Sequence, residues 1–487
     1  MKKKVLLTII GVMLLVCVLC ACSESTKQDA VKTDISATDT VQGNGGMAVQ
    51  YGNYLYFING YIGEDALNTS GDVVKGGVMR VTLVDGEPDY KTLVSIAPKN
   101  VYGSDTTYGG IYIVGDYIYY NTTSIDKNSK REYKTSEGVL TRTSIDGSTT
   151  ESIKNFDDNA TVIYAGDNSN YLAYIVDSYI YLYNPSNGKI TTASQSTVDG
   201  KTEDKTVIAY TCKGDYIFYT MYNFANENNY SSDYITYALD LTNGKTTKLL
   251  DSASQNGDNE TTLYKQTIVD IDIKSDEFTL FYKLEDNTAN GTNKGYYSYT
   301  YNKSNPTFAL ENQVRYTNEV STSYTKFYKL ANGNVLAFNS SLFNIFNADG
   351  TRLQKENYTT DESKYVSISL GNSVTLIDVE ETSSAVSVRF IYDETFYYFQ
   401  LYSIDNNVYT PTYESSNVIA FFDSCYSTDY VGYDMLNGNI YYINDDVNNN
   451  AYYYAIPDLD SITKDTDITS GKILGQISED DLIDLLS

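Results

Sequence analysis

The chain of 487 residues contains no histidine and no tryptophan, and it has only 6 prolines and 5 cysteines. The absence of histidine excludes Ser–His–Asp and Cys–His relays, the usual zinc ligand sets and His-ligated haem. Any catalysis would therefore have to use carboxylates, tyrosine, lysine or a bound ion.

Cysteine is scarce in the body of the chain. Cys17, Cys20 and Cys22 lie in the N-terminal segment, so only Cys212 and Cys425 remain beyond it. Two isolated cysteines in apparently distant repeats are more typical of small buried hydrophobic residues than of a disulfide.

Positive charge is also scarce: 35 Lys and Arg stand against 63 Asp and Glu, for a formal net charge of −28. Such a polyanion is repelled by phosphate backbones and by anionic lipid surfaces. We therefore expect no nucleic acid partner. The charge favours solubility first, with cation binding or attraction to a basic partner as the alternative.

The longest apolar run lies near the N-terminus. Three lysines follow Met1, Val5 to Val18 are mostly apolar, and Leu19-Cys-Ala-Cys22 comes next. This order is typical of an export signal, and the run is too short for a spanning helix. The last four residues resemble the lipobox of bacterial lipoproteins.

That resemblance implies a signal peptide at 1–21 and a lipid on Cys22, which would become the mature N-terminus. It also implies an extracytoplasmic protein held at the cell membrane by this lipid. An ordinary cleaved signal peptide or an uncleaved anchor is the alternative.

Polar residues dominate the next segment, with scattered single apolar ones, so that 22–46 reads as the lipidated Cys and a tether. A flexible chain of about 24 residues has a root-mean-square span of roughly 25–30 Å.

Tyrosine is abundant, with 50 residues, and it recurs in a fixed setting. A Gly-Asp or Gly-Asn pair precedes a short run rich in Tyr and aliphatic residues, which favours a tight turn followed by a strand. The examples are Tyr51–Asn59, Val114–Asn121, Lys213–Tyr219, Asn332–Asn339 and Asn437–Asn444.

A second pattern alternates with the first: a strand-like run enters Asp-Gly or Asn-Gly and another strand follows. These pairs favour the positive φ angles of tight hairpins. The examples are Val81–Gly86, Thr143–Gly147, Asn184–Gly188, Leu239–Gly244 and Phe346–Gly350.

Together the two patterns predict four-stranded antiparallel units that begin near residues 47, 110, 161, 206, 264, 324, 365 and 430. Four strands in each unit of roughly 55 residues are typical of β-propeller blades. We predict an all-β chain with a single propeller over 47–477, preferably of eight blades. Seven is the alternative, because Val366 to Asp423 holds more strand-like runs than one blade needs.

The strand motif reads Tyr56-Phe-Ile-Asn59, Tyr181-Leu-Tyr-Asn184 and Tyr441-Tyr-Ile-Asn444. It resembles the YWTD repeat of LDL-receptor-like propellers, found also in surface lipoproteins of unknown function, with Trp replaced and Asp changed to Asn. The resemblance covers about 47–477, implies the propeller fold and implies no catalytic residue.

The chain closes with residues 478–487, where Ser478 and Asp481 resemble a helix capping box. We expect a short C-terminal helix or tail that packs on the last blade, or a free interaction motif.

Two groups of oxygen-bearing side chains are weak candidates for a Ca²⁺ site. Asp445, Asp446 and Asn448 lie in one loop, although turn formation explains such residues without a metal. Asp270 and Asp272 lie two apart in a predicted strand and share a face, which we expect to be solvated rather than a cation site.

These observations favour a monomeric, membrane-tethered propeller that binds a peptide, a glycan or a partner protein without catalysis and without a required cofactor. The alternative is a carboxylate-based glycan hydrolase or lyase at the cell surface. Three or more carboxylates gathered at the centre of the ring would favour the alternative.

Overall fold

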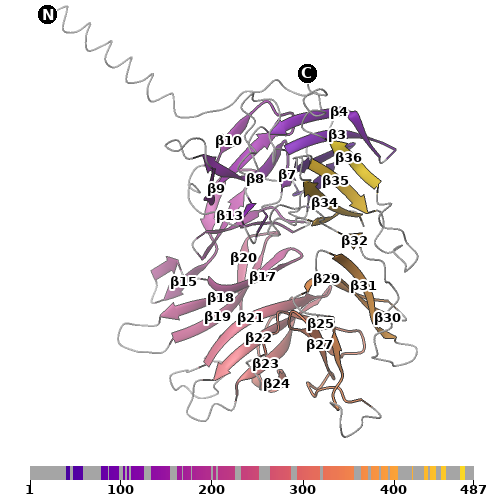
Figure 1. The fold of residues 1–487 in the computed structure, drawn as a ribbon. Helices are drawn as coiled ribbons and strands as arrows, with labels where there is room; N and C mark the ends of the chain where they lie inside the picture. The colour runs from indigo at the N-terminus through magenta and orange to yellow at the C-terminus, as the bar shows by residue number, and fades with distance from the viewer. Residues whose placement is uncertain are drawn as a thin grey trace, which may run out of the picture.

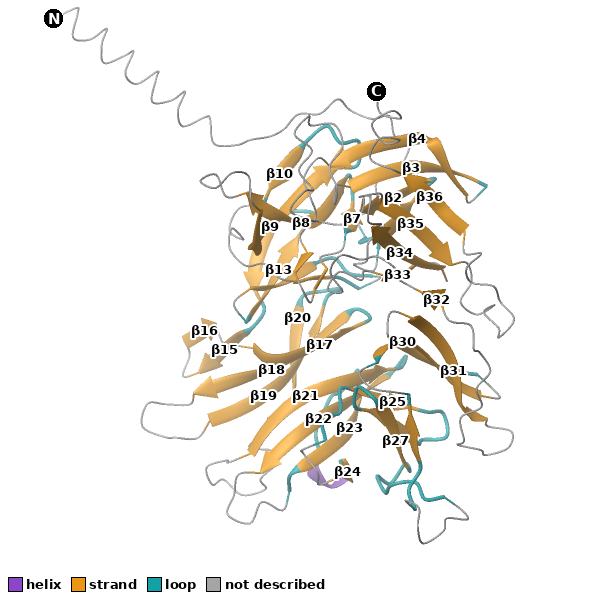
Figure 2. Cartoon of the chain, in the orientation of Figure 1, coloured by secondary structure: helices purple, strands orange, loops and turns teal. Residues whose placement is uncertain are grey.

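The described part of the chain consists almost entirely of β-strands, as the computed structural model shows (Figure 2). The structure describes residues 40–43, 48–58, 78–97, 103–104, 107–108, 111–125, 133–153, 162–198, 201–204, 207–224, 232–251, 264–286, 293–317, 322–355, 364–370, 374–403, 419–420, 433–445, 451–456 and 472–477, except 86, 167, 177, 383–384, 393–394 and 437–438. From Arg389 onwards only the backbone is described. No helix among these residues is long and apolar enough to cross a membrane.

The described strands form eight four-stranded antiparallel sheets, each made of four strands that are consecutive in the sequence. The first sheet contains β1 (Ala48–Tyr51), β2 (Tyr54–Ile58), β3 (Val78–Val84) and β4 (Glu87–Ala97). The second contains β7 (Tyr112–Val114), β8 (Tyr117–Ile125), β9 (Tyr133–Ser144) and β10 (Thr150–Ser152). The third contains β11 (Val162–Tyr164), β12 (Leu172–Val176), β13 (Tyr179–Asn184) and β14 (Lys189–Thr192).

Three sheets follow in the middle of the chain. The fourth contains β17 (Val207–Lys213), β18 (Tyr216–Phe224), β19 (Ser232–Asp240) and β20 (Lys245–Asp251). The fifth contains β21 (Tyr264–Ile273), β22 (Glu277–Asp286), β23 (Gly295–Asn302) and β24 (Val314–Thr317), with the 3₁₀ turn η1 (Leu310–Asn312) before β24. The sixth contains β25 (Lys326–Lys329), β26 (Val335–Phe338), β27 (Leu342–Phe346) and β28 (Ser367–Ser369).

The last two sheets complete the series. The seventh contains β29 (Thr375–Glu381), β30 (Ala385–Tyr392), β31 (Thr395–Ser403) and β32 (Ile419–Ala420). The eighth contains β33 (Tyr433–Leu436), β34 (Asn439–Asp445), β35 (Ala451–Ile456) and β36 (Lys472–Ile477). Two hairpins lie between sheets, β5 (Gly103–Ser104) with β6 (Thr107–Tyr108), and β15 (Gln195–Val198) with β16 (Lys201–Asp204).

The first strand of each sheet, here called the inner strand, lies on the side of the sheet that faces the centre of the propeller. Inner strand β17 lies beside β21, and β21 lies beside β25. At the start of the chain β1 lies beside β7, and it also lies beside β33 of the last sheet. Figure 1 shows the result: the yellow strands of the last sheet lie next to the indigo strands of the first. This arrangement of sheets is that of a β-propeller.

Both predicted kinds of turn are confirmed. Glycine has a positive φ in the turns between the first and second strands and in those between the third and fourth strands. The first group contains Gly52, Gly115, Gly214 and Gly333, and the second contains Gly147, Gly188, Gly244 and Gly350. Since strands alternate in direction, both kinds of turn lie at the same end of their sheets, here called the tight-turn end.

Short polar side chains stabilise the second kind of turn. Asp349 Oδ1 accepts hydrogen bonds from the backbone N–H of Thr351 at 2.9 Å and from its hydroxyl at 2.6 Å. These bonds lower the pKa of the Asp349 carboxyl. Asp240 makes the same pair of bonds to Thr242, at 2.9 Å and 2.6 Å. The Asp-x-Thr spacing therefore encodes the turn locally.

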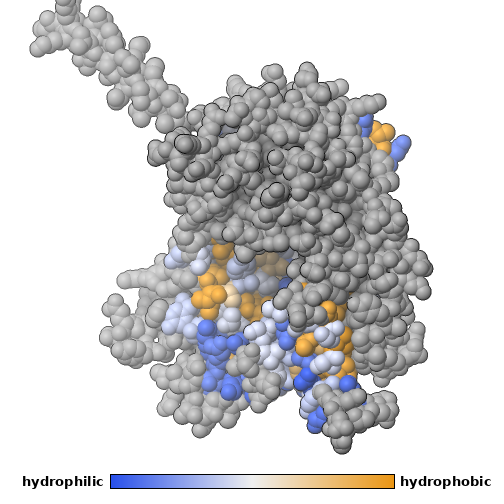
Figure 3. Space-filling model, viewed as in Figure 1, coloured by the Kyte–Doolittle hydropathy of each residue, from blue (hydrophilic) through white to orange (hydrophobic). Residues whose placement is uncertain are grey.

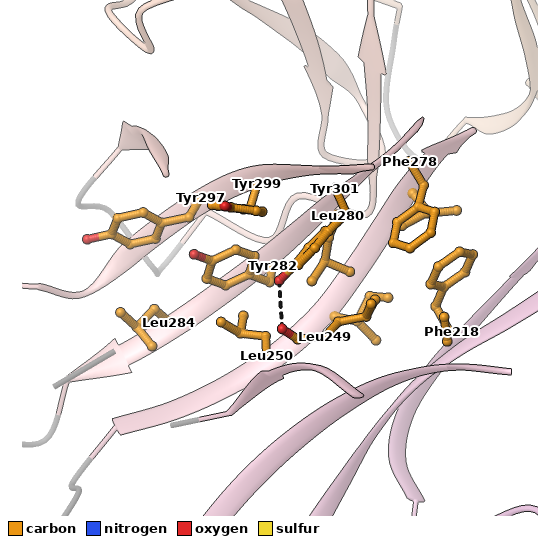
Figure 4. Close-up of a cluster of buried hydrophobic side chains, with 13 residues drawn as sticks. Phe218, Leu249, Leu250, Phe278, Leu280, Tyr282, Leu284, Tyr297, Tyr299 and Tyr301 are labelled. Atoms are coloured by element: carbon orange, nitrogen blue, oxygen red, sulfur yellow. Dashed lines mark hydrogen bonds between the residues drawn. The ribbon is translucent and has the colours of Figure 1, made fainter. Parts of the chain in front are cut away.

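Tyrosine fills the space between sheets, where this chain has no tryptophan. In the cluster of Figure 4, tyrosine and phenylalanine rings from β18, β22 and β23 pack on leucines from β20 and β22. The buried hydroxyl of Tyr301 on β23 donates to the backbone oxygen of Leu249 on β20, at 3.1 Å. The ring of Tyr301 thus buries a large apolar area and also forms a polar link to the preceding sheet.

The first two sheets repeat one further contact. Arg80 on β3 lies over the ring of Tyr54, at 4.2 Å, and Arg142 on β9 lies over the ring of Tyr117, at 4.3 Å. Tyr56 faces Arg80 and Tyr119 faces Arg142 in the sheet register. The arginines and tyrosines thus occupy corresponding positions, which supports the interpretation of the sheets as sequence repeats.

One predicted boundary is wrong. The seventh unit was expected to begin near residue 365, but the seventh sheet begins at Thr375. Ser367–Ser369 instead pairs with β27 as the outer strand of the sixth sheet. This explains the surplus of strand-like runs after Val366, because the long connection between β27 and β28 separates that strand from its own unit.

Candidate functional site

The inner strands of three consecutive sheets bring charged side chains together. Lys213 comes from the end of β17, Asp270 from the middle of β21, and Lys326 from the start of β25. We call these three residues, with Asp272, the inner-strand cluster. These residues come from strands of three different sheets. They lie close together because β21 lies beside both β17 and β25.

Asp270 is the centre of this cluster. A β-bulge precedes it, between Ile268 and Asp270 in the pairing with β22, and its side chain is only 5% exposed. Its Oδ2 accepts a hydrogen bond from the backbone N–H of Phe327 at 2.8 Å, and its Oδ1 accepts one from the N–H of Ile271 at 2.8 Å. The carboxylate thus satisfies backbone donors on two inner strands.

Burial raises the pKa of Asp270 above its usual range. The positive charge of Lys326, the two backbone N–H groups and the positive charge of Lys213 act in the opposite direction, because each stabilises the ionised form. The solvated-face interpretation of Asp270 is therefore wrong, because its side chain is buried and the charges of Lys326 and Lys213 lie close enough to stabilise its ionised form.

Asp272 shares the face of Asp270, as its spacing predicted, but has a different setting. Its side chain is partly exposed, and its Oδ2 atom is buried without a hydrogen-bond partner. Lys213 Nζ donates a hydrogen bond at 3.0 Å to the backbone oxygen of Ile271, the residue between the two aspartates in the sequence. Asp272 Oδ2 is thus a buried acceptor that no described group satisfies.

Cys212 lies beside Lys213 at the edge of the cluster, and its thiol is held in the neutral form. Burial raises the pKa of its thiol to about 12, although the charge of Lys326 lowers it in part. On the same strand Ile208 and Tyr210 are 40% and 42% exposed, two of the four exposed large hydrophobic side chains in the described part of the chain. The described side chains visible in Figure 3 likewise mix hydrophobic and hydrophilic groups over the middle sheets.

The other predicted metal ligands lie where the structure describes no side chains. Asp445 ends β34, where only the backbone is described, and Asp446 and Asn448 lie outside the described residues. Among the described side chains, no three Asp, Glu, Cys or His residues gather closely enough to hold a metal ion.

Sequence reasoning found Asp270 and Asp272 but missed Lys213 and Lys326. The only local signal for Lys213 is its place directly before the Gly214-Asp215 turn, and Lys326 has none. Their convergence depends on which strands are inner strands and which sheets are neighbours.

No protein-family model matches the sequence, and no curated protein matches it. The described fold is similar to several solved structures. One is dipeptidyl peptidase 4 of Porphyromonas gingivalis, with 8% identity and a TM-score of 0.41. The match covers 95% of this chain and 64% of that chain. Another is the β-propeller domain of the Trilobed protease from Pyrococcus furiosus, with 8% identity and a TM-score of 0.33, covering 74% of this chain and 95% of that one. A third is a nidogen/laminin complex, with 10% identity and a TM-score of 0.25, covering 57% and 89%.

Proposed function

We propose that this chain is an extracytoplasmic β-propeller lipoprotein, anchored to the membrane through Cys22, that binds a peptide, a glycan or a partner protein without catalysing a reaction. The observation that carries the binding role is the inner-strand cluster. Lys213, Asp270 and Lys326 come from three separate sheets and hold opposite charges at their shared junction. Such an arrangement presents fixed donors and acceptors to a polar ligand.

We also propose that the eight sheets are eight blades of one closed ring, with the junction of β1 and β33 as the point of closure. A closed ring makes the inner strands a rigid frame. Rigid placement favours binding, because little conformational entropy is lost when a ligand binds.

The carboxylate hydrolase has no specific observation in its favour. Of the two aspartates in the cluster, Asp270 is committed to backbone N–H groups of β21 and β25. A retaining or inverting glycosidase needs two carboxyl groups free to face one glycosidic bond. Binding by Lys213, Lys326 and Asp272 fits these contacts better.

A ligand screen tests the binding role. Glycan and peptide arrays would be probed with residues 22–487, and each hit would be measured again with Lys213→Gln, Lys326→Gln and Asp272→Asn. Lys274→Gln is a matched control, since Lys274 is exposed in the tight turn after β21. We expect at least tenfold weaker binding with a cluster variant and no change with the control. A hit that all three cluster variants leave unchanged would contradict the proposed site.

The anchor has its own test. A lipid with two acyl chains supports stable attachment, whereas one chain binds only marginally, since each buried CH₂ contributes about 0.8 kcal/mol. We expect mass spectrometry of the mature N-terminal peptide to find a diacylglyceryl group on Cys22, and Cys22→Ser to lose it while the propeller stays folded. A mature chain that begins at another residue would contradict the lipoprotein proposal.

A further inference from the structure

A short segment before the first sheet pairs with the inner strand of the second sheet. Gln42 and Ile113 form an antiparallel bridge with two backbone hydrogen bonds, Gln42 N–H to Ile113 O at 2.7 Å and Ile113 N–H to Gln42 O at 3.0 Å. Residues 40–43, here called the clip, thus lie along the inner edge of β7. The sequence assigned these residues to the tether.

The clip is held by its side chains as well. Val41 is 3% exposed and packs with Tyr112, Val114 and other residues of the second and third sheets. Gly43 has a φ of +96°, and a Cβ at this position would lie 2.6 Å from Val49 Cγ2 and 3.2 Å from Ile111 O. A close fit on both sides indicates a specific docking of the clip rather than an incidental contact.

The pairing fixes the position of Thr40, where the described chain begins. In an antiparallel register with Gln42 opposite Ile113, Thr40 lies level with Gly115, the glycine of the turn between β7 and β8. Tyr51, at the end of β1, places its hydroxyl 3.4 Å from the backbone oxygen of the same Gly115. Thr40, the first described residue, therefore lies at the tight-turn end, beside the inner strand of the second sheet.

We propose that the tight-turn end of the propeller faces the membrane and that the opposite end, where β2 leads to β3 and each sheet leads to the next, faces outward. This rests on the proposed lipid anchor at Cys22. A tether of about 17 residues spans at most roughly 60 Å when fully extended. If the opposite end faced the membrane, the tether would have to run from the inner strand across the four strands of one sheet and then along their length. This path is roughly 50 Å long.

Such a path would require the tether to be almost fully extended, whereas its root-mean-square span as a flexible chain is roughly 23 Å. The tight-turn end is acidic, with Asp116, Asp215 and Asp240 among its residues, so it stands off from an anionic bilayer instead of pressing against it. The membrane thus faces this end across a gap that the tether bridges.

The test compares two labels on one hairpin. Lys265 lies near the start of β21, with a side chain that is 41% exposed, and Ser275 is exposed in the tight turn at the other end of the same strand. Full-length lipidated protein with Cys212 and Cys425 replaced by alanine would carry a donor fluorophore on Lys265→Cys or on Ser275→Cys. Vesicles of phosphatidylcholine would contain a headgroup-labelled acceptor lipid.

We expect energy transfer to be at least twofold more efficient from the label on Ser275→Cys. Equal transfer, or higher transfer from Lys265→Cys, would overturn the proposal. The clip variant Gly43→Val would reduce the difference, and an unchanged difference in folded Gly43→Val protein would show that the clip does not set the orientation. The mass of the N-terminal peptide separates the two proposals: lipidated Cys22 with equal transfer contradicts the orientation alone, while Cys22 without lipid contradicts the anchor and the orientation with it.

Discussion

Asp270 on β21 and Phe327 on β25 are joined by a 2.8 Å hydrogen bond from the backbone N–H of Phe327 to the carboxylate of Asp270. This bond crosses the junction between two sheets. It satisfies a donor on an inner strand, where the ladder of that sheet offers no further partner.

Asp270→Ala tests this link. The variant leaves the Phe327 N–H without its acceptor, and an unsatisfied buried donor costs about 1–3 kcal/mol. We expect a loss of that size in the free energy of unfolding, measured with urea at pH 7. Asp276→Ala is the control, since Asp276 is exposed in a turn and its replacement should change stability by less than about 0.5 kcal/mol. Equal effects of the two variants would contradict the proposed link.

The raised pKa of Asp270 predicts a pH dependence. The folded state binds this proton more tightly than the unfolded state, so the contribution of Asp270 to stability falls as pH rises from about 3.8 to the folded pKa. Asp270→Asn removes the titration. The stability of the wild type relative to Asp270→Asn should therefore decrease as pH rises through this window and then level off. An increase over the same window would mean that the pKa is lowered instead.

Two turn glycines should differ in their tolerance of a side chain. Gly188 and Gly350 have φ angles of +68° and +83°, but a Cβ at Gly188 meets nothing within 4 Å, whereas one at Gly350 lies 2.2 Å from Arg315 O. Gly188→Ala should cost only the left-handed backbone strain of about 1–2 kcal/mol. Gly350→Ala must also move the backbone of β24, and we expect it to cost clearly more in thermal unfolding. Equal shifts in Tm would show that β24 yields freely.

The hydroxyl of Tyr301 gives a further test. Removing it in Tyr301→Phe takes a buried hydrogen bond from Leu249 O and should lower the free energy of unfolding by about 0.5–1.5 kcal/mol. Tyr210→Phe removes a hydroxyl from a side chain that is 42% exposed and serves as the matched control with little expected effect. A larger loss for Tyr210→Phe would contradict the assigned contact.

Much of the fold could be predicted because its signals are local. A glycine with positive φ marks tight turns of both kinds, and in the second kind an Asp or Asn two residues before a Ser or Thr adds local hydrogen bonds, as at Asp349 and Thr351. The predicted unit starts near 47, 161, 206 and 264 lie within two residues of β1, β11, β17 and β21 for this reason.

The rest depends on contacts between distant segments. The burial of Asp270 follows from the position of β25, 57 residues away in sequence, and the docking of Val41 follows from β7. The period-2 pattern shows that Asp270 and Asp272 share a face, but not what covers that face.

Each sheet is built from consecutive strands, which predicts where the proposed ring opens first when the protein unfolds. No strand of the first sheet is contributed by the described C-terminal residues, so the seam between β1 and β33 is crossed by no sheet ladder. Each blade can form soon after its own strands are synthesised, whereas the seam joins residues almost 400 positions apart and must close last. When denaturant is added, the first and last sheets should separate from each other before any sheet unfolds. Amide hydrogen exchange should therefore be fastest in these two sheets.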